Sequence, residues 1–160
     1  MSVPHHPDVE ELKTIYTDLG QFEVDMDPIE YIREEGVLLA IIVRADFTEP
    51  GTTPFTDERL PLQMSIMNKQ NGEVVGPHLH PSVEAKSRGE FRQEMLHVVA
   101  GSMEVGVHSR SGELIETVLL GTGDTILLTE GHSTRFLEET KVLEIKQGPY
   151  PGKDSDKTWL

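Results

Sequence analysis

The sequence has 160 residues, enough for one domain with a sizeable hydrophobic core, and its apolar fraction of 36% and charged fraction of 26% are ordinary for a soluble globular protein. A formal net charge of −14 disfavours binding to nucleic acid or to an anionic membrane surface, because the overall field repels both. The chain has no cysteine, which excludes disulfides, thiolate metal ligands and a cysteine nucleophile.

Residues 1–36 predict a lead-in followed by a covering helix. They contain no basic region followed by an apolar stretch, and no apolar run in the chain approaches the roughly 20 residues of a membrane-spanning helix, so we expect a cytoplasmic protein. Asp8 and Glu11 have the spacing of a capping box, and apolar residues follow at helical intervals. A further helical turn is expected from Asp27 through Ile32. Such a helix usually shields an open edge of a β-barrel.

Residues 37–150 predict a β-barrel. Val37 to Val43 is a continuous apolar run, typical of a strand buried on both faces. Residues 45–61 are rich in proline, threonine and acids, which indicates a long loop of the kind that often forms a lid. Apolar alternation or β-branched runs predict further strands at 62–68, before His78, and at 93–101, 102–109, 113–120, 125–129 and 141–147. A polar tail, 151–160, follows, in which Trp159 is expected to pack on the barrel or on a partner subunit.

Four residues on or beside these strands are candidate metal ligands. His78 and His80 are separated by one residue in an extended segment, so their imidazoles point the same way. Glu94 lies in an apolar run, where an ionised carboxylate is costly unless a cation or donor answers it, and His132 comes at the end of a later strand. Three imidazoles and one carboxylate suit Fe(II), Mn(II), Ni(II) or Zn(II) and leave coordination positions open. If Glu94 does not bind, three histidines still support Fe(II) or a zinc-bound water.

The same residues resemble the two motifs of the cupins, small β-barrels that hold one metal between strands. The resemblance is carried by the two histidines of 78–80, by Glu94 with Gly101 seven positions later, and by Gly-Asp-Thr-Ile-Leu-Leu at 123–128 leading to Gly-His at 131–132. It spans roughly residues 62–147. It implies an all-β fold, a single cupin barrel (a double-stranded β-helix or jelly roll) with the N-terminal helical segment outside it.

The chain is also similar to a group of stand-alone cupins of unassigned reaction, some of which accompany surface-glycan genes. This similarity rests on segments 123–128, 131–132, 136–139 and 144–150. The chain departs from the general cupin pattern in the long interval 81–93 before the glutamate and in Thr129, where the second motif usually has proline. The histidine also follows its glycine directly, and Thr134 stands where the motif usually has it.

Cationic and amide side chains near the proposed metal are the candidate substrate contacts. Lys86, Arg88 and Arg92 lie between the second histidine and the glutamate, and either an anion-binding segment or a solvated loop with local salt bridges explains them. Gln63 is expected to share a strand face with Ser65 and with the cavity.

Two further histidines lie on predicted strands. His97 is an odd number of positions from Glu94 and should face away from it, which favours a packed or hydrogen-bonded histidine over a ligand. His108 lies close to a turn and is expected at the surface.

These observations leave three functions open. The first is an enzyme with one divalent transition metal that acts on a small anionic metabolite, by oxygen insertion with iron or by Lewis-acid chemistry with zinc, nickel or manganese. The second is a non-catalytic module that holds a metal-chelating or glycan-derived ligand. The third is a metal-free sugar-nucleotide isomerase or epimerase of cupin fold, which the shared face of His78 and His80 disfavours. The resemblance also implies a homodimer formed through paired barrel edges.

Overall fold

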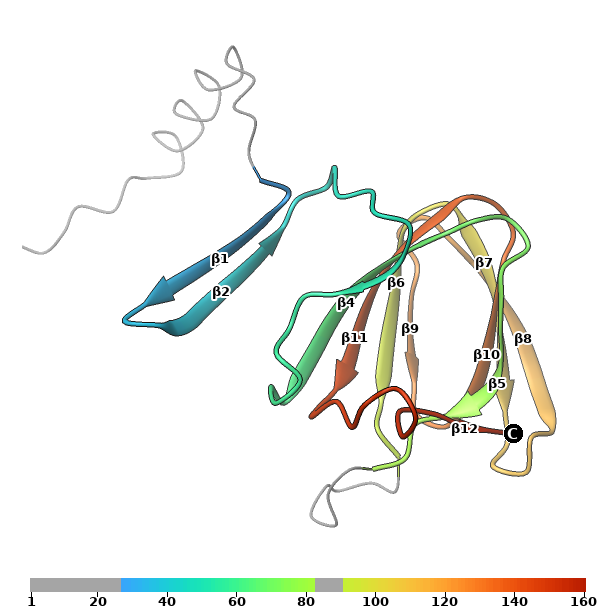
Figure 1. Ribbon diagram of the computed structural model, residues 1–160. Coiled ribbons are helices and arrows are strands. Elements are labelled where there is room, and N and C mark those ends of the chain that lie inside the picture. Colours follow the sequence, from blue (N-terminus) through green and yellow to red (C-terminus); the bar gives the residue numbers. More distant parts are fainter. Residues whose placement is uncertain (1–26, 83–90) are drawn as a thin grey trace, which may run out of the picture. The chain divides into compact units, whose positions relative to one another are not determined.

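The structure, a computed structural model, describes residues 27–82 and 91–160, and every regular element within these ranges is a β-strand (Figure 1). Its contacts divide the chain into two units, Met1–Phe47 and Thr48–Leu160. No helix among the described residues is long and apolar enough to cross a membrane.

In the first unit, β1 (Ile29–Glu34) and β2 (Val37–Val43) form an antiparallel hairpin. The two turn residues, Glu35 and Gly36, have φ of 48° and 83°. Two positive φ values in succession are the type I′ arrangement, whose twist matches that of the flanking strands. The apolar run of β2 therefore pairs with β1 in this unit.

The helical turn expected from Asp27 through Ile32 is wrong. Ile29–Glu34 is a strand, because its β-branched and aromatic residues pair with β2 along their whole length. No helix of the predicted N-terminal segment occurs in residues 27–36. The capping box at Asp8 and Glu11 lies outside the described residues.

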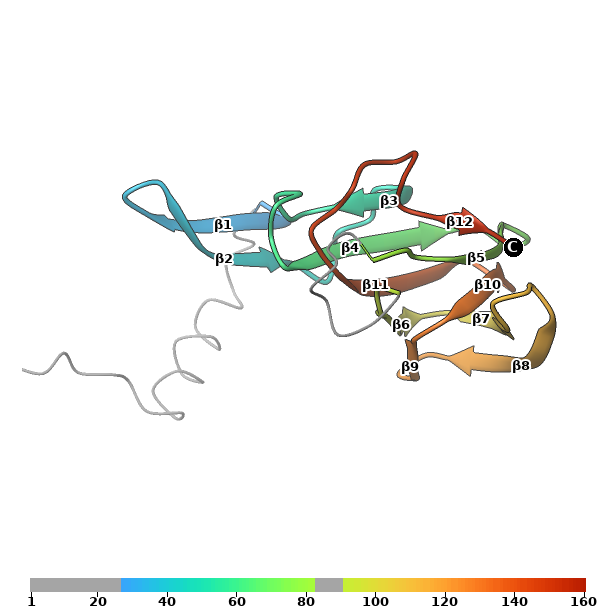
Figure 2. The same cartoon turned by 90° about the horizontal axis from the view of Figure 1, so that it is seen from below.

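The second unit consists of two five-stranded sheets, ordered β12-β5-β10-β7-β8 and β3-β4-β11-β6-β9. The sheets curve toward each other and enclose an interior (Figures 1 and 2). The strands are β3 (Gly51–Pro54), β4 (Leu62–Lys69), β5 (Val74–Leu79), β6 (Glu94–Ala100), β7 (Ser102–His108), β8 (Leu114–Gly121), β9 (Thr125–Leu128), β10 (Gly131–Phe136), β11 (Thr140–Gln147) and β12 (Thr158–Trp159). Neighbouring strands pair antiparallel.

The inward-facing residues change from polar at one end of the barrel to apolar at the other. The antiparallel register aligns them, since Lys146 lies opposite Gln63 and Val142 lies opposite both Met67 and Val98. The apolar end is a core of buried side chains: Met67, Leu96, Val98, Met103, Val105, Leu120, Leu128, Phe136 and Val142. The polar end therefore holds the groups that can carry chemistry.

The C-terminal segment, residues 149–160, returns to the barrel and pairs with it. β12 lies beside β5, with Trp159 opposite His78, and the backbone N–H of Leu160 donates to the carbonyl of Pro77 at 3.0 Å. The missing side chain at Gly131 leaves room for Leu160, whose Cδ1 would lie 2.6 Å from a Cβ there. The segment expected to be a polar tail thus lies against the strand that carries a predicted metal ligand.

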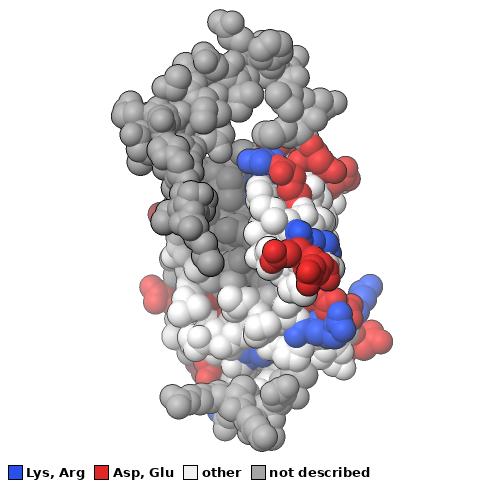
Figure 3. All heavy atoms as spheres, turned by 90° about the vertical axis from the view of Figure 1, so that its left-hand side faces the viewer, with Lys and Arg blue, Asp and Glu red and all other residues white. Residues whose placement is uncertain are grey.

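Acidic side chains accompany the basic ones on the surface, as the net charge of −14 leads one to expect. On the face drawn in Figure 3, the lysine and arginine side chains of the described residues lie beside aspartate and glutamate. That face therefore has no continuous basic patch within the described part of the chain.

Candidate metal centre

The four predicted ligand residues meet at the polar end of the barrel. One ligand atom from each of His78, His80, Glu94 and His132 lies within 4.8 Å of every other. His78 is on β5 with His80 just beyond its end, His132 lies opposite His78 on β10, and Glu94 begins β6 in the other sheet. The three histidines are 2% exposed and the glutamate 4%. The barrel thus brings four candidate metal ligands together in one buried site.

Backbone carbonyls orient all three imidazoles. The acceptors are the oxygens of Gly76, 2.8 Å from Nδ1 of His78, of Asp156, 2.7 Å from Nδ1 of His80, and of Glu130, 3.2 Å from Nδ1 of His132. A carbonyl can only accept, so each Nδ1 must carry its proton and donate it. Each Nε2 is then left to bind a metal, which is the usual outer-shell arrangement of a metal-ligating histidine.

Two buried polar atoms at this centre have no hydrogen bond, Nε2 of His80 and Oε2 of Glu94. They lie 2.8 Å apart, close enough for electrostatic attraction but without hydrogen-bond geometry, and Nε2 of His132 lies 3.6 Å from the same oxygen. Buried polar atoms without partners cost free energy. A metal ion among them would satisfy both atoms, so the donor set fits a metal.

The charge states of these groups follow from burial and from their neighbours. Burial, with a smaller contribution from His132, lowers the pKa of His78 to about 3, so this imidazole is neutral. Burial by itself would raise the pKa of Glu94, but His132 and His80 outweigh it and hold the pKa well below its usual range. Burial lowers the pKa of His80, whereas Asp156 and Glu94 raise it overall. A proton on His80 and a metal at the same nitrogen therefore compete.

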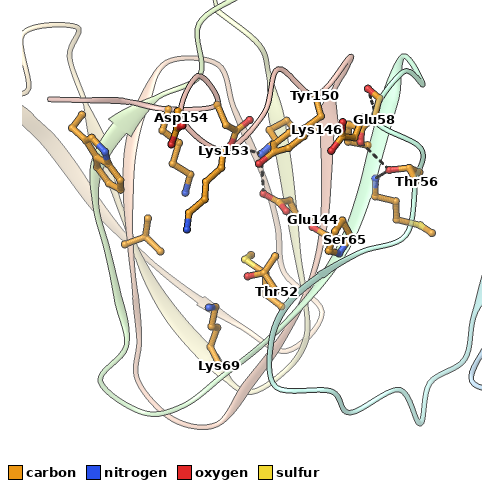
Figure 4. A pocket seen from close by; sticks show the side chains of 18 residues that line it. Thr52, Thr56, Glu58, Ser65, Lys69, Glu144, Lys146, Tyr150, Lys153 and Asp154 are labelled. Atoms are coloured by element: carbon orange, nitrogen blue, oxygen red, sulfur yellow. Dashed lines mark hydrogen bonds and ion pairs between the residues drawn. The ribbon is translucent and has the colours of Figure 1, made fainter.

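A cavity of about 900 Å³ is lined by residues of β3, β4, β11 and the C-terminal segment (Figure 4). Three lining residues also lie next to the metal ligands. Lys146 is opposite Glu94 in the sheet, Asp156 contacts His80, and the ring of Trp159 has its centroid 5.5 Å from that of His78. A small molecule in the cavity would therefore lie beside the metal centre.

The barrel is similar to that of an oxalate decarboxylase variant from B. subtilis, with a TM-score of 0.51 and 20% sequence identity over 70% of this chain and 29% of that one. This likeness shows the fold of the barrel alone, and the four-residue cluster lies in this protein's own barrel. No protein-family model matches its sequence, and no curated protein matches it either.

Two further solved structures have TM-scores below 0.5. The oxalate decarboxylase of Lactobacillus farciminis, in a formate complex, has a TM-score of 0.47 and 21% identity over 62% of this chain and 27% of that one. KdgF from a Halomonas species has a TM-score of 0.46 and 22% identity over 68% of this chain and 88% of that one. This chain thus spans less than a third of the length of each of the two decarboxylases.

The predicted substrate contact Arg92 is buried, and its guanidinium is hydrogen-bonded within the protein. It donates to the carboxylate of Asp156 at 2.8 Å, to the carbonyl of the same residue at 2.9 Å and to the carbonyl of Pro81 at 3.0 Å. Lys86 and Arg88 lie outside the described residues.

Gln63 faces the barrel interior and lines the cavity, as the strand alternation predicts. Its amide nitrogen donates to the carbonyls of Asp57 and Leu60, at 3.0 and 2.9 Å, and its amide oxygen accepts from the hydroxyl of Thr56 at 3.0 Å. These bonds attach the loop before β4 to the barrel. The segment predicted as a loop, 45–61, also contains β3.

The predictions for the two other histidines on strands, His97 and His108, differ in outcome. His97 is only partly buried and its Nδ1 lies 2.9 Å from the hydroxyl of Thr125, which confirms that it is not one of the four grouped ligands. The surface position expected for His108 is wrong, because this residue is buried. Its Nδ1–H donates to the carbonyl of Gly112 at 3.2 Å, so its Nε2 accepts from the hydroxyl of Ser133 at 2.9 Å.

Sequence reasoning missed two residues beside the centre, Asp156 and Lys157. Lys157 is half-buried and lines the cavity, and its ammonium lies 5.8 Å from the ring centroid of Trp159. Among the described residues it has no ion pair or hydrogen bond. Both residues lie in a polar stretch without a motif, so no signal in the sequence marks them.

Proposed function

We propose that this protein is a mononuclear-metal cupin, an enzyme that acts on a small anionic metabolite. The observation that carries the proposal is the buried cluster of His78, His80, Glu94 and His132, in which two polar atoms have no hydrogen bond. Imidazole ligands favour Fe(II), Mn(II), Ni(II) or Zn(II) over Ca(II) and Mg(II), which prefer oxygen shells. When bound, such a metal supplies Lewis acidity or, in the case of iron, oxygen chemistry.

The protein's own residues would hold the metal and exclude bulk water from it. The three Nδ1 bonds orient the imidazoles so that each Nε2 is available to a metal, and the burial of all four ligands would keep bulk water from that metal. Four ligands leave positions for two atoms of a chelating substrate on an octahedral ion. The likeness to oxalate decarboxylase supports the fold alone. The residues that line the cavity support the class of substrate.

Lysines in the cavity support an anionic substrate. Lys153 extends into the cavity from the C-terminal segment, and Lys69, whose ammonium pairs with Glu73 at 3.3 Å, extends into it from the other side (Figure 4). Lys157 has no charged partner in ion-pair contact among the described residues, burial lowers its pKa, and its charge contributes to the lowered pKa of His78. A carboxylate or phosphate on a metal-bound ligand would neutralise this half-buried ammonium.

Purified protein should contain close to one transition metal ion per chain. The test is inductively coupled plasma mass spectrometry on protein prepared without an affinity tag and without added metal. Iron would direct the search for substrates to oxygen consumption, and zinc, nickel or manganese would direct it to isomerisation and hydrolysis. Protein that holds no metal, even after reconstitution, would contradict the proposal.

The Lys157→Gln variant should bind a small dicarboxylate about 10- to 100-fold more weakly, because a hydrogen bond to a charged group is worth about 1.5–3 kcal/mol. The probe is oxalate, titrated calorimetrically into metal-loaded protein. Lys141→Gln is the matched control, since Lys141 is on β11 but does not line the cavity. Equal oxalate affinity in Lys157→Gln and wild type would remove this residue from the substrate site.

The second candidate is a non-catalytic module that holds a chelating anion with the same groups. It is supported by the same metal cluster and the same half-buried lysine, and it differs from an enzyme only in turnover. Metal-loaded protein that binds small carboxylates but neither consumes oxygen nor converts them would favour the module. A metal-free isomerase gains no support, because the Nε2 atoms of His80 and His132 both lie near one oxygen of Glu94.

A further inference from the structure

Asp156 links the C-terminal segment to the metal centre through both its backbone and its side chain. Its carbonyl accepts the Nδ1–H of His80 at 2.7 Å. Its carboxylate accepts from Arg92 at 2.8 Å and from the ammonium of Lys146 at 3.1 Å. The residue is 6% exposed, so these contacts are made away from water.

His80 differs from the other two histidines in where its orienting carbonyl comes from. His78 and His132 each bond the carbonyl two residues earlier in the chain, so the local backbone sets their rings. His80 lies just past the end of β5, and its acceptor is 76 residues away in sequence. The orientation of this one ligand therefore depends on a remote segment being in place.

The C-terminal segment is held in place by main-chain pairing and by charge. Thr158 pairs with Leu79 and Trp159 with His78, immediately after Asp156 in the chain. The carboxylate of Asp156 lies 2.8 Å from the guanidinium of Arg92 and 3.1 Å from the ammonium of Lys146, and all three side chains are buried. Loss of this carboxylate would leave the buried Arg92 without its anion and Lys146 with Glu144 alone, which is costly.

We propose that Asp156 is a positioning residue for the metal ligand His80, and that the C-terminal segment completes the metal centre from outside the strands that bear the ligands. This inference rests on the proposed metal-binding function. The carboxylate fixes the segment between Arg92 and Lys146, and the segment then presents its carbonyl to the imidazole. Groups that orient a ligand in this way typically contribute 10- to 100-fold to metal affinity, by the general behaviour of outer-shell partners.

The test uses Co(II) as the probe, added to chelator-treated full-length protein. Asp156→Asn keeps the size of the side chain and should weaken Co(II) binding by roughly 10- to 100-fold, with an altered ligand-field spectrum. Asp154→Asn is the matched control, because Asp154 is exposed in the same segment and should leave the affinity within about twofold of wild type. Thermal unfolding of the metal-free proteins checks that each variant is folded.

A double-mutant cycle distinguishes the positioning of His80 from a general loosening of the C-terminal segment. If Asp156 acts through His80, Asp156→Asn should change Co(II) affinity less than about twofold in a His80→Ala background. An equal loss in both backgrounds, or no loss in the single variant, would overturn the inference while wild-type protein still binds Co(II). Wild-type protein that binds no Co(II) would overturn the metal centre and this inference together.

Discussion

Replacing His78 with alanine should abolish metal retention at purification. The change removes one of four ligands and leaves a cavity where a 2% exposed imidazole faces His132 with ring centroids 4.3 Å apart. Loss of a ligand should exceed the 10- to 100-fold effect of an outer-shell change, so affinity should fall by more than about 100-fold. Metal content by mass spectrometry, on protein expressed and purified in parallel with wild type, measures the effect.

A stability measurement distinguishes this result from simple misfolding. A metal held at 1,000 times its dissociation constant stabilises a protein by about 4 kcal/mol, so chelation should lower the unfolding temperature of wild type but not that of His78→Ala. His97→Ala is the matched control, because this histidine on β6 is directed to Thr125 and not to the centre. Stoichiometric metal in His78→Ala would show that the cluster does not bind it.

Much of the barrel follows from the sequence because most of its strands bury one face. Strands 62–68 and 141–147 alternate clearly, and their observed bounds differ only slightly at the ends. The same alternation places His78 and Glu94 on the inner face, where the structure has them. β10 escaped prediction because its inward residues His132 and Thr134 are polar, so it lacks an apolar period.

Other features depend on contacts that no short stretch of sequence contains. The hairpin of β1 and β2 was missed because Glu35 adopts a positive φ, which is uncommon outside glycine and asparagine. The bond between His80 and Asp156 joins residues 76 positions apart, and the ion pairs of Asp156 reach two different strands or loops. A local sequence pattern identifies the candidate metal ligands. The residues that hydrogen-bond to those ligands can be identified only in the folded structure.

Replacing Phe136 with alanine should lower the free energy of unfolding by about 3–5 kcal/mol, the usual cost of removing a buried phenylalanine side chain. Phe136 is 0% exposed and belongs to the apolar core at the end of the barrel opposite the metal centre. Denaturant unfolding of chelator-treated protein measures the change without a contribution from bound metal. Leu119→Ala, at a side chain 64% exposed, should stay within about 0.5 kcal/mol of wild type.

The two ends of the barrel should then behave independently. Phe136 and His132, which lies opposite His78, are four residues apart on the same strand, and at about 3.4 Å per residue this separates them by roughly 14 Å. At such distances the effects of two substitutions usually add within about 0.5 kcal/mol, so Phe136→Ala and His78→Ala should be additive in metal-free protein. Phe136→Leu, which preserves most of the core volume, should retain stoichiometric metal. A Phe136→Leu protein that folds but loses its metal would mean that the core itself sets the ligand geometry.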